Sequence, residues 1–204
     1  MSDIDAIMRI APVIPVLVVD DAKQARPLAE TLVSGGLTVL EVTLRTPAAL
    51  EVIREMKKVP GAVVGAGTVT NKAKLDAAIE AGSEFIVAPG LTDDLGRAAI
   101  ASGVPFLPGV ATAGEIMRGL DLGLTRFKFF PAMAAGGLPA LKAHVAVFGD
   151  VRFCPTGGIS EETAPDWLAL EAVLCVGGSW VTGKGAPDYV AVGEAARRAS
   201  RLAR

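Results

Sequence analysis

The chain has 204 residues, of which 51% are hydrophobic and 21% charged, and its formal net charge is −2. This length allows one sizeable core, so we expect residues 1–204 to form a single domain. Because the charge is small and no basic stripe is present, nucleic acid and anionic membranes are not expected partners. No apolar run reaches the roughly 20 residues of a membrane-spanning helix, and the acidic start does not match a signal peptide, so we expect a cytoplasmic protein.

Short β-branched apolar runs alternate with alanine-rich amphipathic segments along the chain. The first ten residues are expected to form a short helix. The predicted strands then follow at residues 12–19, 39–44, 62–69, 85–90, 104–111, 126–131, 152–158 and 172–180. Helical patterns lie between them, for example at residues 21–36, 47–58 and 71–83. Each unit takes about 25 residues, which is typical of parallel βα architecture.

Eight such units predict a closed (β/α)8 TIM barrel, with the short N-terminal helix covering its closed end. A doubly wound open sheet is the alternative. That fold usually has fewer strands at this length and a glycine-rich loop after its first strand. Here the first predicted strand runs into VVDDAKQA, which contains no glycine, whereas glycines follow the later strands. The pattern therefore favours the barrel.

One lysine lies inside an apolar strand, in the stretch RFKFFPA at residues 126–132, where Lys128 has phenylalanine on both sides. A buried ammonium is poorly solvated, so a lysine in this position needs a partner or a task. Strand side chains alternate between two faces. We therefore expect Lys128 and Phe130 to point into the barrel, and Phe127 and Phe129 to point toward the helices.

The same alternation in VLEVTLRT places Glu41, Thr43 and Arg45 inside the barrel. Glu41 is the only carboxylate that this argument places inside near a strand end, which is where barrel active sites lie. Desolvation favours the neutral amine of Lys128, which can attack a ketone and form a Schiff base while Glu41 moves protons. The alternative is a buried Lys128–Glu41 ion pair that only joins two strands.

Other reactive side chains give weaker signals. Cys154 and Cys175 lack CxxC spacing and are expected to be reduced core residues. His144 is the only histidine and lies in a predicted helix, so we expect neither a Ser-His-Asp triad nor a metal site. Arg126 and Arg152 lie at strand starts, where pairing with acids would stabilise the opposite end of the barrel.

Two glycine doublets follow the last two predicted strands, in CPTGGIS and CVGGSW. The loops after strands 7 and 8 of a TIM barrel often bind phosphate, because backbone N–H groups can approach the anion closely there. One doublet alone is typical of an ordinary turn. A doublet in each of the two loops favours a phosphate site, where the Ser179 hydroxyl can also donate.

Six motifs occur in the order VLEVTLRT, VVGAGTV, APGLT, FKFFPA, RFCPTGGI and LCVGGSW. In this order they resemble the bacterial 2-keto-3-deoxy-6-phosphogluconate (KDPG) aldolases, which are class I aldolases of the Entner–Doudoroff pathway. The resemblance extends from about residue 12 to residue 181, and FKFFPA and RFCPTGGI are its most specific motifs. It implies cleavage of 2-dehydro-3-deoxy-6-phospho-D-gluconate to pyruvate and D-glyceraldehyde 3-phosphate by a homotrimer that needs no cofactor or metal.

The resemblance also implies a role for each matching residue. Lys128 is the Schiff-base lysine, and Glu41 is the general acid/base that relays protons with bound water. The positions that match the rest of the substrate pocket are Arg45, Thr68 and Pro89 at the pyruvate carboxylate, Phe130 beside them, and Thr156 near the substrate hydroxyls. The positions that match the phosphate site are Gly157, Gly158, Gly178 and Ser179.

Two features depart from the family pattern. Met133 stands where many relatives carry Glu, and the stretch VTGKGAPDYV after the last strand differs, which makes Lys184 a further candidate for the edge of the phosphate pocket. Two other functions are considered: a 4-hydroxy-2-oxoglutarate aldolase with the same mechanism, and a non-covalent phosphosugar-binding or isomerase barrel that uses Glu41 alone. The presence of Lys128 and Glu41 together argues against the second.

Overall fold

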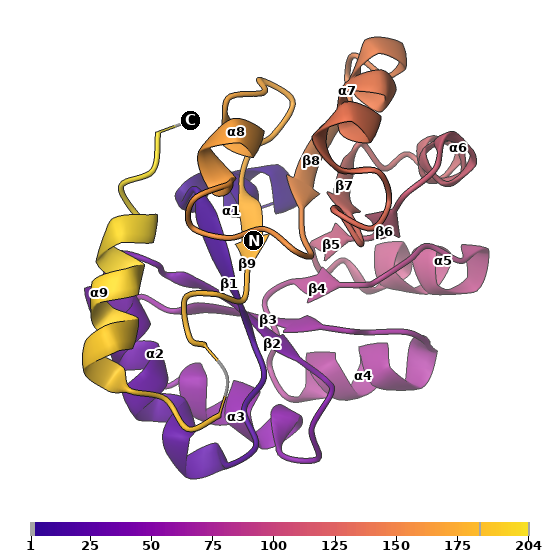
Figure 1. Cartoon of the computed structure of the whole chain (residues 1–204). Helices are drawn as coiled ribbons and strands as arrows, with labels where there is room; N and C mark the ends of the chain where they lie inside the picture. The colour runs from indigo at the N-terminus through magenta and orange to yellow at the C-terminus, as the bar shows by residue number, and fades with distance from the viewer. Residues whose placement is uncertain (1–2, 184, 204) are drawn as a thin grey trace.

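The computed structural model describes residues 3–183 and 185–203, in which parallel strands alternate with helices (Figure 1). The strands are β1 (Val13–Leu17), β2 (Val39–Thr43), β3 (Val63–Gly67), β4 (Ile86–Val87), β5 (Phe106–Leu107), β6 (Gly109–Val110), β7 (Arg126–Phe129), β8 (Arg152–Pro155) and β9 (Val176–Gly178). The helices are α1 (Ile4–Ile10), the 3-10 turn η1 (Ala22–Gln24), α2 (Ala25–Ser34), α3 (Ala49–Met56), α4 (Lys72–Glu80), α5 (Asp93–Ser102), α6 (Ala113–Asp121), α7 (Gly137–Val147), α8 (Ala164–Leu168) and α9 (Tyr189–Ala199).

The strands form two parallel sheets. Six strands lie in the order β5-β4-β3-β2-β1-β9, and three lie in the order β6-β7-β8. Helices α2 to α7 and α9 lie on the outer side of the strands, as Figure 1 shows, whereas α1 packs against the interior. The prediction of a closed eight-stranded TIM barrel is therefore wrong, because the strands build an open, curled α/β fold.

A proline lies at each break between the two sheets. The segment predicted as one strand at residues 104–111 divides at Pro108 into β5, which pairs with β4, and β6, which pairs with β7. At the other break β8 and β9 form no continuous ladder, and isolated bridges occur at Phe153↔Val173 and Thr156↔Gly177, on either side of Pro155. Proline has no N–H to donate to a ladder. The apolar pattern of a strand therefore continues through these positions while its hydrogen bonding does not.

The strand side chains divide between two apolar clusters. The larger one lies between strands and helices and includes Leu40, Val42, Phe127 and Phe129, the faces that strand alternation predicted to point outward. The smaller one joins α1 to the interior of the curled sheets through Ile7, Met8, Ile14, Val39, Phe85, Val87, Leu107, Cys154, Leu174 and Cys175. Both cysteines are buried and neither is in a disulfide, as expected for core residues. Among the described residues, none of the helices has the length and apolar character needed to cross a membrane.

Candidate active site

Lys128 on β7 and Glu41 on β2 meet in the interior. Lys128 Nζ lies 2.9 Å from Glu41 Oε1 and 3.2 Å from Oε2. The two residues are only 5% and 4% exposed, and Nζ also lies 5.4 Å from the centroid of the Phe130 ring. At this distance a proton can pass directly between the amine and the carboxylate. The arrangement joins a candidate nucleophile to a candidate base, and it also satisfies both buried charges.

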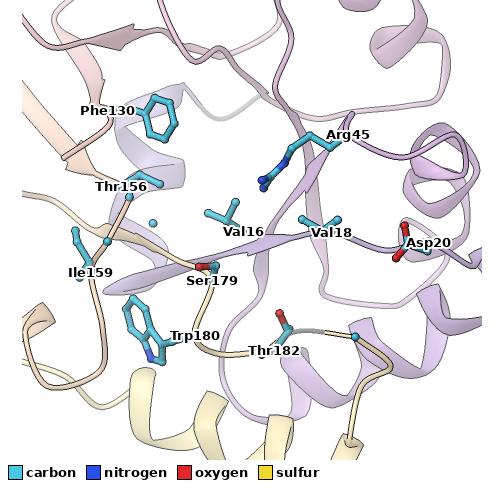
Figure 2. Close-up of a pocket in the computed structure, with 15 residues that line it drawn as sticks. Val16, Val18, Asp20, Arg45, Phe130, Thr156, Ile159, Ser179, Trp180 and Thr182 are labelled. Atoms are coloured by element: carbon cyan, nitrogen blue, oxygen red, sulfur yellow. The ribbon is translucent and has the colours of Figure 1, made fainter. Parts of the chain in front are cut away.

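A cavity of about 600 Å³ opens beside this pair, at the C-terminal ends of β1, β8 and β9 (Figure 2). Phe130, which contacts Lys128, forms part of its wall and links the pair to the cavity. In Figure 2 the guanidinium group of Arg45 points into the cavity, between Phe130 and Val18. The cavity thus offers one cation on the side of β2, and the Gly157–Gly158 turn and the Ser179 hydroxyl on the side of β8 and β9.

The cavity brings together more than half of the predicted site residues. They are Arg45, Phe130, Thr156, Gly157, Gly158 and Ser179. Gly157 and Gly158 have φ values of 106° and 79°, a left-handed backbone that favours glycine. Because neither residue carries a side chain of its own, the backbone of this turn can approach an anion closely.

Besides Lys128 and Glu41, which lie next to the cavity, three predicted residues are not among those that line it. Thr68 follows β3 and has a φ of 60°, the only positive value of a non-glycine residue in the described chain. Pro89 follows β4, and its carbonyl oxygen lies against Gly109, where an ideal Cβ would be 2.2 Å away. Gly178 lies within β9, and the Trp180 ring fills the space that its side chain would take. Packing against Trp180 is therefore a sufficient reason for glycine at position 178, and no bound ligand is needed to explain it.

Several cavity residues were missed by the sequence analysis. They are Val16, Val18, Asp20, Ile159, Gly177, Trp180, Thr182, Gly183 and Gly185. A signal was present for some of them: Val16 lies in β1, Val18 and Asp20 continue from it at a spacing of two, and strand alternation therefore predicts one shared face. Lys184, the further candidate for this wall, lies outside the described residues.

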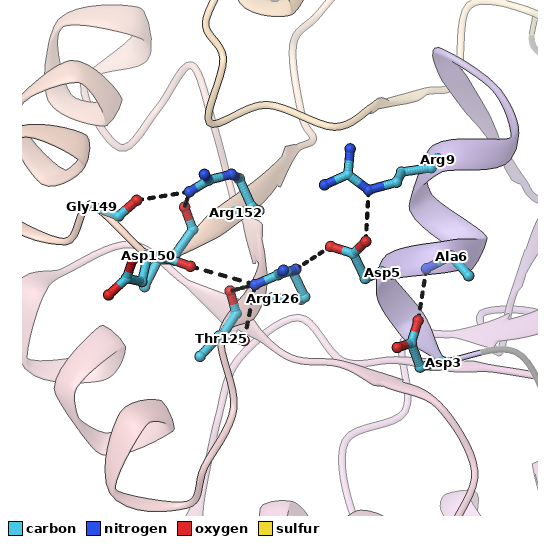
Figure 3. A network of polar contacts seen from close by, with 10 residues as sticks. Asp3, Asp5, Ala6, Arg9, Thr125, Arg126, Gly149, Asp150 and Arg152 are labelled. Carbon is cyan, nitrogen blue, oxygen red and sulfur yellow. Dashed lines mark hydrogen bonds and ion pairs between the residues drawn. The ribbon is translucent and has the colours of Figure 1, made fainter.

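The two arginines at the strand starts belong to the opposite end of the fold (Figure 3). Arg126 pairs with Asp5 of α1, as expected, and Asp5 also pairs with Arg9 at 2.6 Å. The hydrogen bond from Arg9 and the charge and hydrogen bond of Arg126 outweigh burial and lower the pKa of Asp5. Arg152 differs from the prediction, because it donates to the backbone carbonyls of Gly149 and Val151.

The remaining candidates do not join the pair. His144 Nε2 lies 3.3 Å from the carbonyl oxygen of Ala111, and its ring packs edge-on against Phe129. Met133 is 51% exposed, and its side chain covers Gly158. Among the described residues, no three His, Cys, Asp or Glu side chains form a group that could hold a metal ion.

A buried lysine–carboxylate pair at the strand ends of an α/β fold, beside a pocket with a cation, a glycine turn and a hydroxyl, defines a protein suited to carbonyl chemistry on an anionic substrate. The model of the KDPG and KHG aldolase family matches residues 4–195. The chain belongs to this family.

Known proteins of the family are similar over nearly the whole chain. The 2-dehydro-3-deoxy-phosphogluconate aldolase of Zymomonas mobilis is 61% identical over 204 residues, which cover 100% of this chain and 98% of that protein. A crystal structure of the Zymomonas mobilis ZM4 enzyme with 3-phosphoglycerate has a TM-score of 0.98 at 61% identity, covering 99% of this chain and 97% of that one. A structure of KDPG aldolase from Legionella pneumophila, with pyruvate captured as a covalent carbinolamine, has a TM-score of 0.95 at 42% identity and 98% coverage of both chains.

Proposed function

We propose that this chain is a Schiff-base aldolase that cleaves 2-dehydro-3-deoxy-6-phospho-D-gluconate to pyruvate and D-glyceraldehyde 3-phosphate. The observation that carries the proposal is the 2.9 Å contact between Lys128 Nζ and Glu41 Oε1 beside the cavity. Membership of the family supports it, as do the 61% identical aldolase of Zymomonas mobilis and the covalent pyruvate adduct of the Legionella pneumophila enzyme.

Lys128 and Glu41 can perform the reaction without a further catalytic side chain. Lys128 gives a proton to Glu41, and the neutral amine adds to the C2 carbonyl of the substrate. Glu41 returns this proton to the C2 hydroxyl, which leaves as water, so that an iminium and an ionised Glu41 remain. Glu41 next takes the proton of the C4 hydroxyl. The C3–C4 bond breaks, its electron pair moves to the iminium as an enamine, and the aldehyde leaves.

The second half of the reaction returns the enzyme to its starting state. Glu41 gives its proton to C3 of the enamine, which restores the iminium. Water then adds to C2 and releases pyruvate and the Lys128 amine. Because the iminium accepts the electron pair in each direction, we propose that neither a metal nor a cofactor takes part.

The other site residues are proposed to hold the two ends of the substrate. Arg45, Thr68 and Pro89 are assigned to the carboxylate, as the family resemblance implies, and the planar guanidinium of Arg45 matches it bidentately. Thr156 is assigned to the substrate hydroxyls. The Gly157–Gly158 turn and Ser179 are assigned to the phosphate, which backbone N–H groups and a hydroxyl can bind.

A second activity is proposed for the same site. The family model covers KDPG aldolases and KHG aldolases, where KHG is 2-keto-4-hydroxyglutarate, another name for 4-hydroxy-2-oxoglutarate. This compound is therefore a candidate substrate with the same mechanism. A non-covalent sugar-binding role is disfavoured, because it would give Lys128 no chemical role beside Glu41. The homotrimer and the cytoplasmic location remain proposals; light scattering of the purified protein tests the first.

Trapping with borohydride tests the proposal. Incubation with pyruvate and borohydride should add one reduced pyruvyl group, and peptide mapping should locate it on Lys128. Lys128→Arg should fold but form no adduct and cleave no substrate, whereas Lys142→Arg, at an exposed position on α7, should behave as the wild type. An adduct on another lysine, or loss of cleavage in EDTA, would contradict the Schiff-base assignment.

A further inference from the structure

Gly67, the last residue of β3, lies directly against the Glu41 side chain. An ideal Cβ at Gly67 would be 2.2 Å from Glu41 Oε1, 2.7 Å from Cγ and 2.8 Å from Cδ. These separations are far below a van der Waals contact of about 3.5 Å. Even a methyl group at position 67 therefore overlaps the carboxylate in its present place.

The backbone around Gly67 has little freedom to move aside. The Gly67 carbonyl accepts the Leu44 N–H at 2.8 Å, and the N–H of Val69 binds the Val87 carbonyl at 3.2 Å. Between them, Thr68 holds a φ of 60°, which is costly for a β-branched residue and persists only where its surroundings impose it. A side chain at position 67 would thus displace the Glu41 carboxylate rather than the strand.

We propose that Gly67 is a positioning residue for proton transfer: its missing side chain leaves the space in which Glu41 reaches Lys128. This rests on the proposed function, in which Glu41 is the acid/base. Displacing the carboxylate by the width of a methyl group would break the 2.9 Å contact with Lys128 Nζ while the amine stays in place. The defect should therefore affect proton transfer more than adduct formation.

Two other interior glycines provide matched comparisons. Gly177 on β9 has an equally close neighbour, since its ideal Cβ would be 2.2 Å from Thr156 Oγ1. Gly65 precedes Gly67 by two residues on the same face of β3, and its ideal Cβ would be 2.5 Å from the Phe85 ring. The three positions differ in what a methyl group would displace. At Gly67 it is the Glu41 carboxylate, at Gly177 the Thr156 hydroxyl, and at Gly65 the Phe85 ring.

The experiment is a double-mutant cycle of Gly67→Ala with Glu41→Gln. Exchange of the pyruvate methyl protons with D2O reports proton transfer, and borohydride trapping reports the adduct. Gly67→Ala should lower the exchange rate roughly 10- to 100-fold, part of the usual contribution of acid–base catalysis, while the trapped adduct still forms on Lys128. In the Glu41→Gln background the same change should lower the rate less than about threefold, because the group it displaces is already inactive.

Gly177→Ala is the control for non-specific damage, since its effect should be equal in both backgrounds. An equal effect of Gly67→Ala in both backgrounds would overturn the positioning role. Absence of any Lys128 adduct in the wild type would instead overturn the proposed function itself. If Gly67→Ala does not fold, adding Glu41→Ala should restore folding, because it removes the atoms that overlap the new methyl group. The same Glu41→Ala change should not improve Gly65→Ala. If the Gly67→Ala/Glu41→Ala variant is as insoluble as Gly67→Ala, the proposal is also overturned.

Discussion

Glu41 Oε1 lies 2.9 Å from Lys128 Nζ, although 87 residues separate the two in the chain. Both are buried, and β2 and β7 belong to different sheets, so the contact joins the two sheets inside the fold. An ion pair at this depth is not a strong source of stability, because desolvation offsets much of the attraction. In the proposed mechanism the contact places a base, Glu41, at hydrogen-bonding distance from the nucleophile, Lys128.

Glu41→Gln should lower turnover by a factor of about 10² or more, because the amide fills the same space but cannot carry a proton. Pyruvate should still react slowly at Lys128. Steady-state cleavage and borohydride trapping measure the two effects separately. Glu80→Gln, at an exposed position on α4, should have no effect. Near-normal turnover of Glu41→Gln would show that another group carries the proton.

Arg45→Lys should raise KM roughly tenfold for every 2-keto acid, phosphorylated or not, because an ammonium keeps the charge but loses the bidentate fork. Initial rates with KDPG and with 4-hydroxy-2-oxoglutarate measure this. Arg97→Lys, on the exposed side of α5, is the matched control. If only the phosphorylated substrate is affected, Arg45 belongs to the phosphate end of the cavity and the proposed substrate orientation is reversed.

Ser179→Asp should discriminate between substrates. A carboxylate beside the Gly157–Gly158 turn would repel a bound phosphate, so cleavage of KDPG should fall roughly tenfold or more while 4-hydroxy-2-oxoglutarate is much less affected. Ser179→Asn adds a similar volume without the charge and should lose less. Equal losses on both substrates would exclude a phosphate role for this position.

Asp5→Asn should lower the free energy of unfolding at neutral pH by about 0.2–1 kcal/mol, the range measured for ion pairs at the surface. The folded-state pKa of Asp5 is lowered by Arg9 and Arg126. Its contribution is therefore present above the unfolded value, near 3.8, and is lost as the pH falls through the folded value. Urea unfolding at pH 7 and at several pH values below 4 should show the two proteins converging. A constant difference would exclude the carboxylate charge as the cause.

The alternation of strand side chains was the most informative property of the sequence. It depends only on local backbone geometry, so it placed Glu41, Lys128 and Arg45 on the inner face without knowledge of the fold. The same rule applied to VIPVLVVD would have added Val16, Val18 and Asp20, which line the cavity. Of the two glycine doublets, Gly157–Gly158 lines the cavity, whereas at Gly178 the Trp180 ring takes the place of a side chain. The phosphate role of both doublets stays a prediction.

The sequence by itself determined the order of strands and helices and the side chains that face inward, because these follow from periodicity along the chain. Only the tertiary structure decided that the strands form two sheets. Pro108 and Pro155 have no N–H to donate, and whether this interrupts a sheet depends on which distant strand lies beside each proline. The tertiary structure also decided the contact of Gly67 with Glu41, which requires β2 and β3 to pair in the register that sets Thr43 opposite Gly67. Such contacts join residues far apart in the chain, and no local pattern encodes their distance.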